Sequence, residues 1–238
     1  MPTTTEPLAA TAPPPFVHDW FRQLRPLSLH EAAPDPRRAA LFSTDMIAAF
    51  LTVGPLSSPR VGALASPVAT LFHRAHAHGL RHFVLLQDTH HPATPEFDAW
   101  PPHAVRGTEE AETIPELRRL PFAESFEIIE KNSLNPAIDT AFNPWLDQHP
   151  DLRTAIVVGN CTDLCVYQLA MHLRLRANAH NHASLRVIVP ANGVDTYDLS
   201  VAEAAAAGVF AHPGDFFHEV FLYHLALNGV EVVSELTS

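Results

Sequence analysis

Residues 154–167 decide the fold, and they read Thr-Ala-Ile-Val-Val-Gly-Asn-Cys-Thr-Asp-Leu-Cys-Val-Tyr. Residues 155–158 are apolar and mostly β-branched, which predicts a buried strand that ends at Gly159. A polar turn follows, and apolar residues then recur at helical spacing, which predicts a helix over residues 163–178. Thr162 is the candidate N-cap of this helix.

Cys165 falls in the first turn of that predicted helix. A thiol at this place feels the positive end of the helix dipole, which lowers its pKa toward the reactive thiolate. A free cysteine is also commonly a small buried hydrophobic residue without chemistry of its own. The turn alone leaves both interpretations open.

Strands and helices alternate along the rest of the chain. The expected strands are residues 39–43, 82–86, 126–129, 155–158, 185–189 and 230–233. The expected helices are residues 59–78, 137–148, 163–178, 201–209 and 216–227. Six short apolar strands separated mostly by helices predict an α/β fold, a three-layer α-β-α arrangement around a six-stranded, mostly parallel sheet.

The first part of the chain differs in composition from the rest. We interpret residues 1–38 as a Pro/Ala-rich N-terminal extension and residues 39–238 as one domain. Four apolar residues in the extension predict a short amphipathic turn that docks on the domain: Phe16, Trp20, Phe21 and Leu24.

Composition excludes several classes of partner. The formal net charge of −11 and the lack of a basic run exclude a nucleic-acid partner. No run approaches ~18 apolar residues, so no membrane partner is expected. The N-terminus lacks a basic region followed by an apolar core, so the cytoplasm is the expected location. The two cysteines, Cys161 and Cys165, do not indicate a disulfide framework.

Polar groups follow the carboxyl ends of four predicted strands. They are Asp45, Asp88, Lys131 and Cys165. Because parallel strands end at one edge of a sheet, all four are expected on one rim, where such folds carry their sites. Taken alone, Asp45 reads as a helix cap and Lys131 as a solvated strand end. Four such groups together favour a functional site.

These groups suit nucleophilic acyl transfer. The Asp45 carboxylate can take the proton of the Cys165 thiol, and Lys131 can supply the nearby positive charge. The backbone N–H groups of Cys161 and Cys165 are the candidate oxyanion donors.

Residues 88–103 form a second group of candidate ligands. Histidines and carboxylates within these sixteen residues can surround one divalent ion. The prolines of the segment predict a stiff loop, and an ordinary proline-rich surface loop with incidental histidines is the competing interpretation. No regular ligand spacing decides between the two.

The chain resembles the isochorismatase-like cysteine hydrolases and, within them, the nicotinamidases. The resemblance runs from Leu41 to Val233. Five pieces carry it: Ser-Thr-Asp-Met-Ile-Ala-Ala-Phe at 43–50, Gln-Asp-Thr-His at 87–90, Trp-Pro-Pro-His-Ala-Val-Arg-Gly-Thr-Glu at 100–109, Glu-Lys-Asn-Ser at 130–133 and Gly-Asn-Cys-Thr-Asp-Leu-Cys-Val at 159–166. The pieces at 100–109 and 159–166 are the specific signals of the family.

The resemblance implies roles for particular residues. The catalytic triad would be Asp45, Lys131 and Cys165. The metal ligands would be Asp88, His90 and His103, with Glu96 at the place of a fourth ligand. Phe50 and Trp100 would sandwich a pyridine ring, and the peptide bond between Asn160 and Cys161 would be cis. The ion would be one divalent metal, zinc in the first place with iron or manganese as alternatives, and its main role would be to orient the substrate.

The resemblance also implies an activity. The expected protein is a metal-dependent cysteine amidohydrolase that deaminates nicotinamide to nicotinate and ammonia through a thioester, in NAD salvage. Its expected partners are a small pyridine carboxamide and further copies of the chain. Two alternatives remain, a sibling hydrolase of another small amide or carbamoyl compound and a non-catalytic binding protein on the same fold. Isochorismate hydrolysis is disfavoured, because those relatives generally lack the nucleophilic cysteine.

Overall fold

The computed structural model describes residues 12–238 of the chain. The prediction of a Pro/Ala-rich extension falls partly on residues 1–11, which lie outside the described residues.

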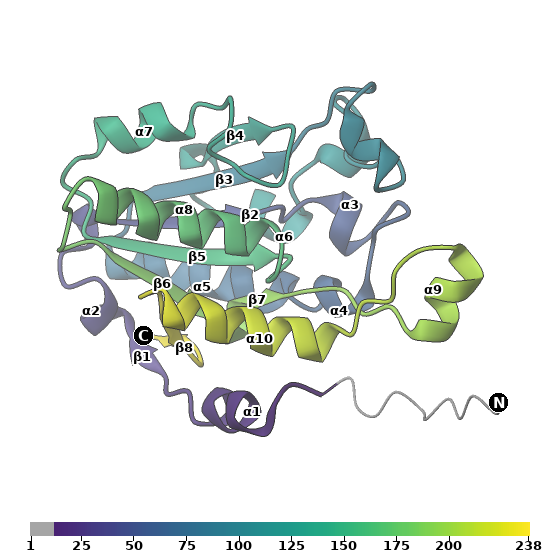
Figure 1. The fold of residues 1–238 in the computed structure, drawn as a ribbon. Helices are drawn as coiled ribbons and strands as arrows, with labels where there is room; N and C mark the ends of the chain where they lie inside the picture. Colours follow the sequence, from purple (N-terminus) through teal and green to yellow (C-terminus); the bar gives the residue numbers. More distant parts are fainter. Residues whose placement is uncertain (1–11) are drawn as a thin grey trace.

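A parallel sheet forms the middle layer (Figure 1). Its strands run in the order β4 (Glu127–Lys131), β3 (His82–Asp88), β2 (Ala39–Thr44), β5 (Thr154–Asn160), β6 (Arg186–Pro190) and β8 (Glu231–Val233). Every pairing among them is parallel. The predicted three-layer α/β fold is therefore confirmed, and each of the six predicted strands is present.

The predicted strand number is wrong by one, because the sheet has seven strands within residues 12–238. The additional strand is β7 (Val194–Asp195), which pairs with the end of β5. On the β5 side, β6 pairs with the first residues of β5 alone, and the turn at Ala191–Gly193 then brings the chain back beside the last residues of β5. A two-residue strand leaves no alternation in the sequence from which to predict it.

Helices cover both faces of the sheet (Figure 1). They are α1 (Pro15–Arg22), α2 (Leu29–Ala32), α3 (Ala48–Leu51), α4 (Pro59–Gly62), α5 (Ala65–His78), α6 (Pro115–Arg118), α7 (Phe142–Gln148), α8 (Cys165–Ala179), α9 (Val201–Ala207) and α10 (Gly214–Leu227). One core lies between the sheet and α5, and a second lies between the sheet and α7, α8 and α10. Adjacent residues of β2 alternate between the cores, with Leu41 in the first and Phe42 in the second. A strand buried on both faces reads as a continuous apolar run, which explains why the inner strands β2, β3, β5 and β6 were predictable.

Three of the predicted helices match α8, α9 and α10 to within two residues at each end, and the other two differ more. The helix predicted over 59–78 is divided into α4 and α5. The helix predicted over 137–148 is only α7, because Asp139 has a left-handed φ of 53° that a right-handed helix cannot contain.

The segment before β2 packs on the C-terminal part of the chain. As predicted, an amphipathic helix, α1, docks there, with the rings of Phe16 and Trp20 edge-on to Tyr223 of α10. Further along, β1 (Leu27–Ser28) pairs in parallel with β9 (Leu236–Thr237) in a separate small sheet. The domain boundary at residue 38 stays a prediction.

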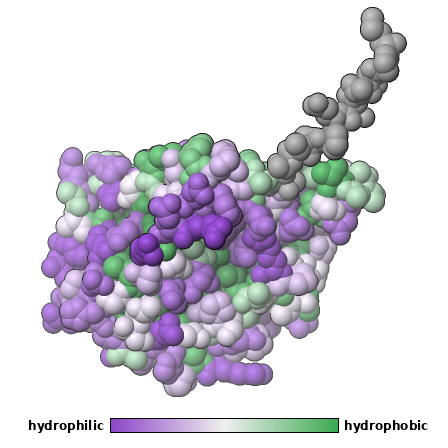
Figure 2. Space-filling model, turned by 90° about the horizontal axis from the view of Figure 1, so that it is seen from below, coloured by the Kyte–Doolittle hydropathy of each residue, from purple (hydrophilic) through white to green (hydrophobic). Residues whose placement is uncertain are grey.

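The surface seen from below is mainly hydrophilic, with apolar groups scattered between polar ones (Figure 2). Among residues 12–238, no helix combines the length and the apolar character needed to cross a membrane.

Candidate active site

The parallel register brings the four predicted strand-end groups together. Asp45 follows β2, while Asp88 and Lys131 end β3 and β4 and are register partners. Cys165 begins α8 after the turn that follows β5. All four side chains are buried. The rim predicted from the sequence therefore exists, although the roles of its residues remain proposals.

Gly159 allows β5 to approach this rim. Its φ is +111°, and a Cβ atom there would lie 2.1 Å from the carbonyl oxygen of Thr44. Only glycine fits such a position without strain. The Asn160 side chain then donates a 2.7 Å hydrogen bond to the carbonyl oxygen of Asp45, which itself has a left-handed φ of 52°. These contacts fix the backbone that carries the carboxylate.

Lys131 lies at the centre of the group. Its Nζ is 2.9 Å from Asp45 Oδ2 and donates at 2.5 Å to Asp88 Oδ1 and at 3.5 Å to Cys165 Sγ. Burial works against its charge, but the Asp45 and Asp88 carboxylates outweigh burial and raise the pKa of Lys131 well above its ordinary value. The lysine is thus a fixed cation in contact with both the carboxylates and the thiol.

Burial shifts both the Asp45 carboxylate and the Cys165 thiol toward their neutral forms. Burial, followed by the charge of Asp88, raises the pKa of Asp45 to about 6, against the opposing effect of Lys131. Ligand atoms of Asp45, Asp88 and Cys165 all lie within 4.8 Å of one another. Burial, followed by the charge of Asp45, raises the pKa of the Cys165 thiol well above its ordinary value.

The predicted lowering of the Cys165 pKa is therefore wrong, because burial and the charge of the nearby Asp45 carboxylate raise that pKa instead. The predicted N-cap is also wrong. The N-cap of α8 is Leu164, and the hydroxyl of Thr162 instead lies 2.9 Å from Nδ1 of His218. The thiol at rest keeps its proton and needs a base.

Asp88, His90 and His103 form a compact ligand group. Their ligand atoms lie within 4.8 Å of one another, and all three residues are buried. In the described part of the chain, neither Oδ2 of Asp88 nor Nε2 of His90 has a hydrogen-bond partner. Buried polar atoms without partners are rare, and a bound cation would satisfy both. The donor set of two imidazoles and a carboxylate fits a borderline divalent ion.

Neighbouring groups fix the orientation of these ligands. Nδ1 of His103 lies 2.9 Å from the carbonyl oxygen of Pro101, and Nδ1 of His90 lies 3.3 Å from Oδ1 of Asn132. The other ring nitrogen of a ligating histidine commonly has such a partner. Glu96 lies outside the compact group, but its Oε1 is 3.7 Å from Nε2 of His90. The sequence did not assign Asn132, although it directly follows Lys131 in a motif that carried the resemblance.

The remaining predicted residues surround this group. The ring of Phe50 lies edge-on to His103 at a centroid distance of 5.5 Å, and Trp100 lies edge-on to Tyr197 at 6.2 Å. The peptide bond between Asn160 and Cys161 is cis, as the resemblance implied. Within residues 12–238, the N–H groups of Thr162, Leu164 and Val166 donate to backbone carbonyls, whereas those of Cys161 and Cys165 have no such partner. The two cysteine amides are therefore free to bind a ligand atom.

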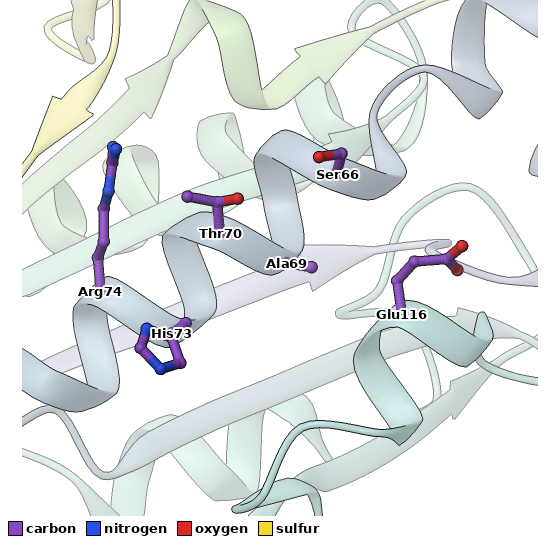
Figure 3. Close-up of a pocket in the computed structure, with 6 residues that line it drawn as sticks. All are labelled: Ser66, Ala69, Thr70, His73, Arg74 and Glu116. Atoms are coloured by element: carbon purple, nitrogen blue, oxygen red, sulfur yellow. The ribbon is translucent and has the colours of Figure 1, made fainter.

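A surface cavity of about 480 Å³ lies elsewhere, on the outer side of α5 (Figure 3). It is lined by Ser66, Ala69, Thr70, His73, Arg74 and Glu116. None of these belongs to the rim, so this cavity is not the candidate active site.

Fold and site together define an α/β protein with a cysteine, a carboxylate and a lysine at the carboxyl edge of its sheet. Solved structures share the fold, among them the following two. The cysteine hydrolase from Pseudomonas syringae pv. phaseolicola 1448A is 19% identical with a TM-score of 0.68, over 89% of this chain and 92% of that chain. A nicotinamidase/pyrazinamidase from Bacillus subtilis is 20% identical with a TM-score of 0.64, over 82% of this chain and 99% of that chain.

The family model of the isochorismatase domain matches residues 39–215. The chain belongs to the isochorismatase family. Nicotinamidase 1 of Arabidopsis thaliana is 32% identical over 162 residues, which cover 63% of this chain and 64% of that relative. The match thus spans less than two thirds of the relative's length.

Proposed function

We propose that the protein is a metal-dependent cysteine amidohydrolase that converts nicotinamide to nicotinate and ammonia. One observation carries the proposal, which is that Cys165, Lys131 and Asp45 meet beside the group of Asp88 and two histidines. A relative named as a nicotinamidase, 32% identical in the matched region, supports the choice of substrate.

The reaction begins with a proton transfer from the Cys165 thiol to the Asp45 carboxylate. Because the pKa of Asp45 is raised to about 6, it is both ionised near neutral pH and basic enough to accept the proton. The Lys131 ammonium, 3.5 Å from the sulfur, stabilises the thiolate as it forms. The sulfur then attacks the carboxamide carbon.

The N–H groups of Cys161 and Cys165 donate to the oxyanion that this attack creates. Asp45 returns its proton to the departing ammonia, leaving a thioester on Cys165. A water molecule then attacks the thioester with Asp45 as base, which releases nicotinate and restores the thiol.

Asp88, His90 and His103 would hold the divalent ion, with Glu96 as a candidate fourth ligand. When bound, the ion supplies a Lewis-acid contact that orients the pyridine nitrogen of the substrate. We favour zinc, with iron and manganese as alternatives. Phe50 and Trp100 would contact the faces of the ring.

The wider biological setting belongs to the same proposal. We place the activity in NAD salvage in the cytoplasm, with a small-molecule substrate, no nucleic-acid or membrane partner, and a homo-oligomeric assembly. Residues 1–38 would be an extension of the hydrolase domain.

An ammonia-release assay with nicotinamide, combined with elemental analysis of the purified protein, tests the proposal. We expect Cys165→Ala to abolish ammonia release and removal of the metal by a chelator to reduce it strongly. Ser66→Ala, in the cavity on α5, controls for handling. Full activity of Cys165→Ala would refute the thioester scheme. Full activity after chelation would favour a sibling amide or carbamoyl hydrolase, and binding of nicotinamide by the wild-type protein without ammonia release would favour a binding protein.

A further inference from the structure

Tyr197 lies at the rim because of the way the strands pair, and no sequence motif pointed to it. It follows β7, whose pairing with the end of β5 sets Asp195 opposite Asn160. Its half-buried ring lies edge-on to Trp100, with a centroid distance of 6.2 Å and an interplanar angle of 84°. Tyr197 therefore lies between the turn that carries the nucleophile and the loop that carries the metal-ligand candidates.

The backbone of Tyr197 is close to the candidate oxyanion residue. Burial raises the pKa of the Cys161 thiol to about 12, and the Tyr197 N–H acts against that rise. Burial also raises the pKa of the Tyr197 hydroxyl well above its ordinary value, so the side chain is neutral. A neutral aromatic ring at this place can shape a pocket without adding charge to it.

His212 holds one face of the Tyr197 ring. The two rings stack at 3.8 Å with an interplanar angle of 17°, and Phe217 stacks on the other side of His212 at 4.4 Å. Both nitrogens of His212 have partners, with Nδ1 2.9 Å from the Tyr197 carbonyl oxygen and Nε2 2.8 Å from Asp163 Oδ2. Asp163 belongs to the turn between Cys161 and Cys165. The ring of Tyr197 is thus fixed relative to the nucleophile.

The contact between Tyr197 and Trp100 limits the space along Trp100. A substrate ring cannot enter between two rings whose centroids are 6.2 Å apart and edge-on, because they already touch. A single six-membered ring stacked on Trp100 can avoid Tyr197, whereas a second fused ring that extends past Trp100 toward β7 meets it.

We propose that Tyr197 is a specificity-determining residue that restricts the site to carboxamides of a single six-membered ring. His212 and Asp163 are positioning residues that act through Tyr197. This inference rests on the proposed amidohydrolase function, because it assigns a limit to the substrate of that same site.

The test compares nicotinamide with the bicyclic quinoline-3-carboxamide, using kcat and KM for ammonia release in wild type and variants. Tyr197→Ala removes the ring, and we expect it to raise the quinoline-to-nicotinamide ratio of kcat/KM by about 10-fold or more, which is the usual size of a pocket-shape effect. The change should appear mainly in KM for the bicyclic amide. Tyr197→Phe keeps the ring and should keep the wild-type ratio.

His212→Ala tests the positioning role. It should raise the same ratio by less than Tyr197→Ala, and the double variant should equal Tyr197→Ala, because the histidine acts only through the tyrosine. Tyr223→Ala is the matched control, since this tyrosine also contacts aromatic rings but on α10, against α1. It should leave the ratio unchanged. Tyr197→Leu, which keeps more apolar volume than alanine, replaces Tyr197→Ala if the latter does not fold.

Dissociation constants of both amides, measured by isothermal titration of wild type and Tyr197→Ala, separate this inference from the proposed function. Tighter binding of the bicyclic amide to the variant than to wild type supports the role of Tyr197, whether or not the proteins release ammonia. Absence of ammonia release from both proteins would refute the hydrolase function and leave the role of Tyr197 in binding intact. Equal binding of the bicyclic amide to the two proteins, or an unchanged kcat/KM ratio, overturns the role of Tyr197.

Discussion

Lys131 neutralises two carboxylates that have no access to solvent. Its side chain is 0% exposed, and its Nζ lies 2.9 Å from Asp45 Oδ2 and 2.5 Å from Asp88 Oδ1. A Lys131→Met variant keeps a long unbranched side chain but leaves both carboxylates without their cation. Removing one partner of a buried ion pair costs about 3–5 kcal/mol. Because a domain is stabilised by only about 5–15 kcal/mol, we expect a large loss of stability at neutral pH.

The loss should depend on pH in a direction that the pKa shifts fix. The pKa of Lys131 is raised by its partners, so its stabilising contribution is complete below the ordinary lysine pKa and is lost only in strong alkali. In the variant, the buried carboxylates can escape the penalty by binding protons. Asp45 already has a pKa of about 6 with the lysine present, and without it the value rises further. The difference in unfolding free energy between wild type and variant should therefore shrink as pH falls from about 8 to about 5.

Urea unfolding followed by far-UV circular dichroism measures this difference. Both proteins are first stripped of metal, because an ion at Asp88 would compensate its charge in the variant. Arg118→Met is the control, since Arg118 pairs with Glu112 at the surface, where we expect a change within about 0.5 kcal/mol. A loss for Lys131→Met below about 1 kcal/mol, or a loss of equal size at both pH values, would refute the electrostatic role of the lysine.

Three further predictions concern Gly159 near the end of β5, the proposed base Asp45 and the buried His218. Gly159→Ala should destabilise the protein by more than about 4 kcal/mol in chemical denaturation, because the new Cβ would lie 2.1 Å from a carbonyl oxygen at a φ of +111°; a loss within about 1 kcal/mol contradicts this. In a pH-rate profile with nicotinamide, kcat/KM should fall as pH drops below about 6, where Asp45 takes up a proton, and a flat profile would exclude Asp45 as the base. Burial lowers the pKa of His218, so its contribution to stability is lost as pH falls below about 6.5. His218→Gln should reduce the slope of unfolding free energy against pH by up to about 1.4 kcal/mol per unit, whereas an unchanged slope would exclude the histidine.

Most of the sheet could be predicted from the sequence because its inner strands β2, β3, β5 and β6 are buried on both faces and read as short, mainly apolar runs. The edge strands β4 and β8 are partly exposed, and only short apolar pairs marked them in the sequence. β1, β7 and β9 have two residues each, and too few residues alternate in them to give a pattern. The break at Asp139 was also hidden, because a left-handed aspartate leaves the apolar spacing around it unchanged.

The rim could be predicted because parallel strands end together, so four distant residues needed only one topological rule to meet. The electrostatics could not be predicted in the same way. The position of Cys165 at a helix start suggested a lowered pKa, but its burial and the distance to Asp45 are properties of the folded chain. Asn132, Tyr197 and His212 were missed because their contacts cross between elements that no local spacing connects.

Asp88 connects the two halves of the site. Its oxygens belong both to the group with His90 and His103 and to the group with Asp45 and Cys165. The negative charge of Asp88 contributes to the raised pKa of Asp45, second only to burial. A cation held by Asp88 would offset that charge and lower the pKa of Asp45. Occupancy of the candidate metal site and the basicity of Asp45, the proposed base, are thus coupled through one side chain. The acid limb of the pH-rate profile should therefore move to lower pH in the metal-loaded protein, even though no metal contact with the thiol is required.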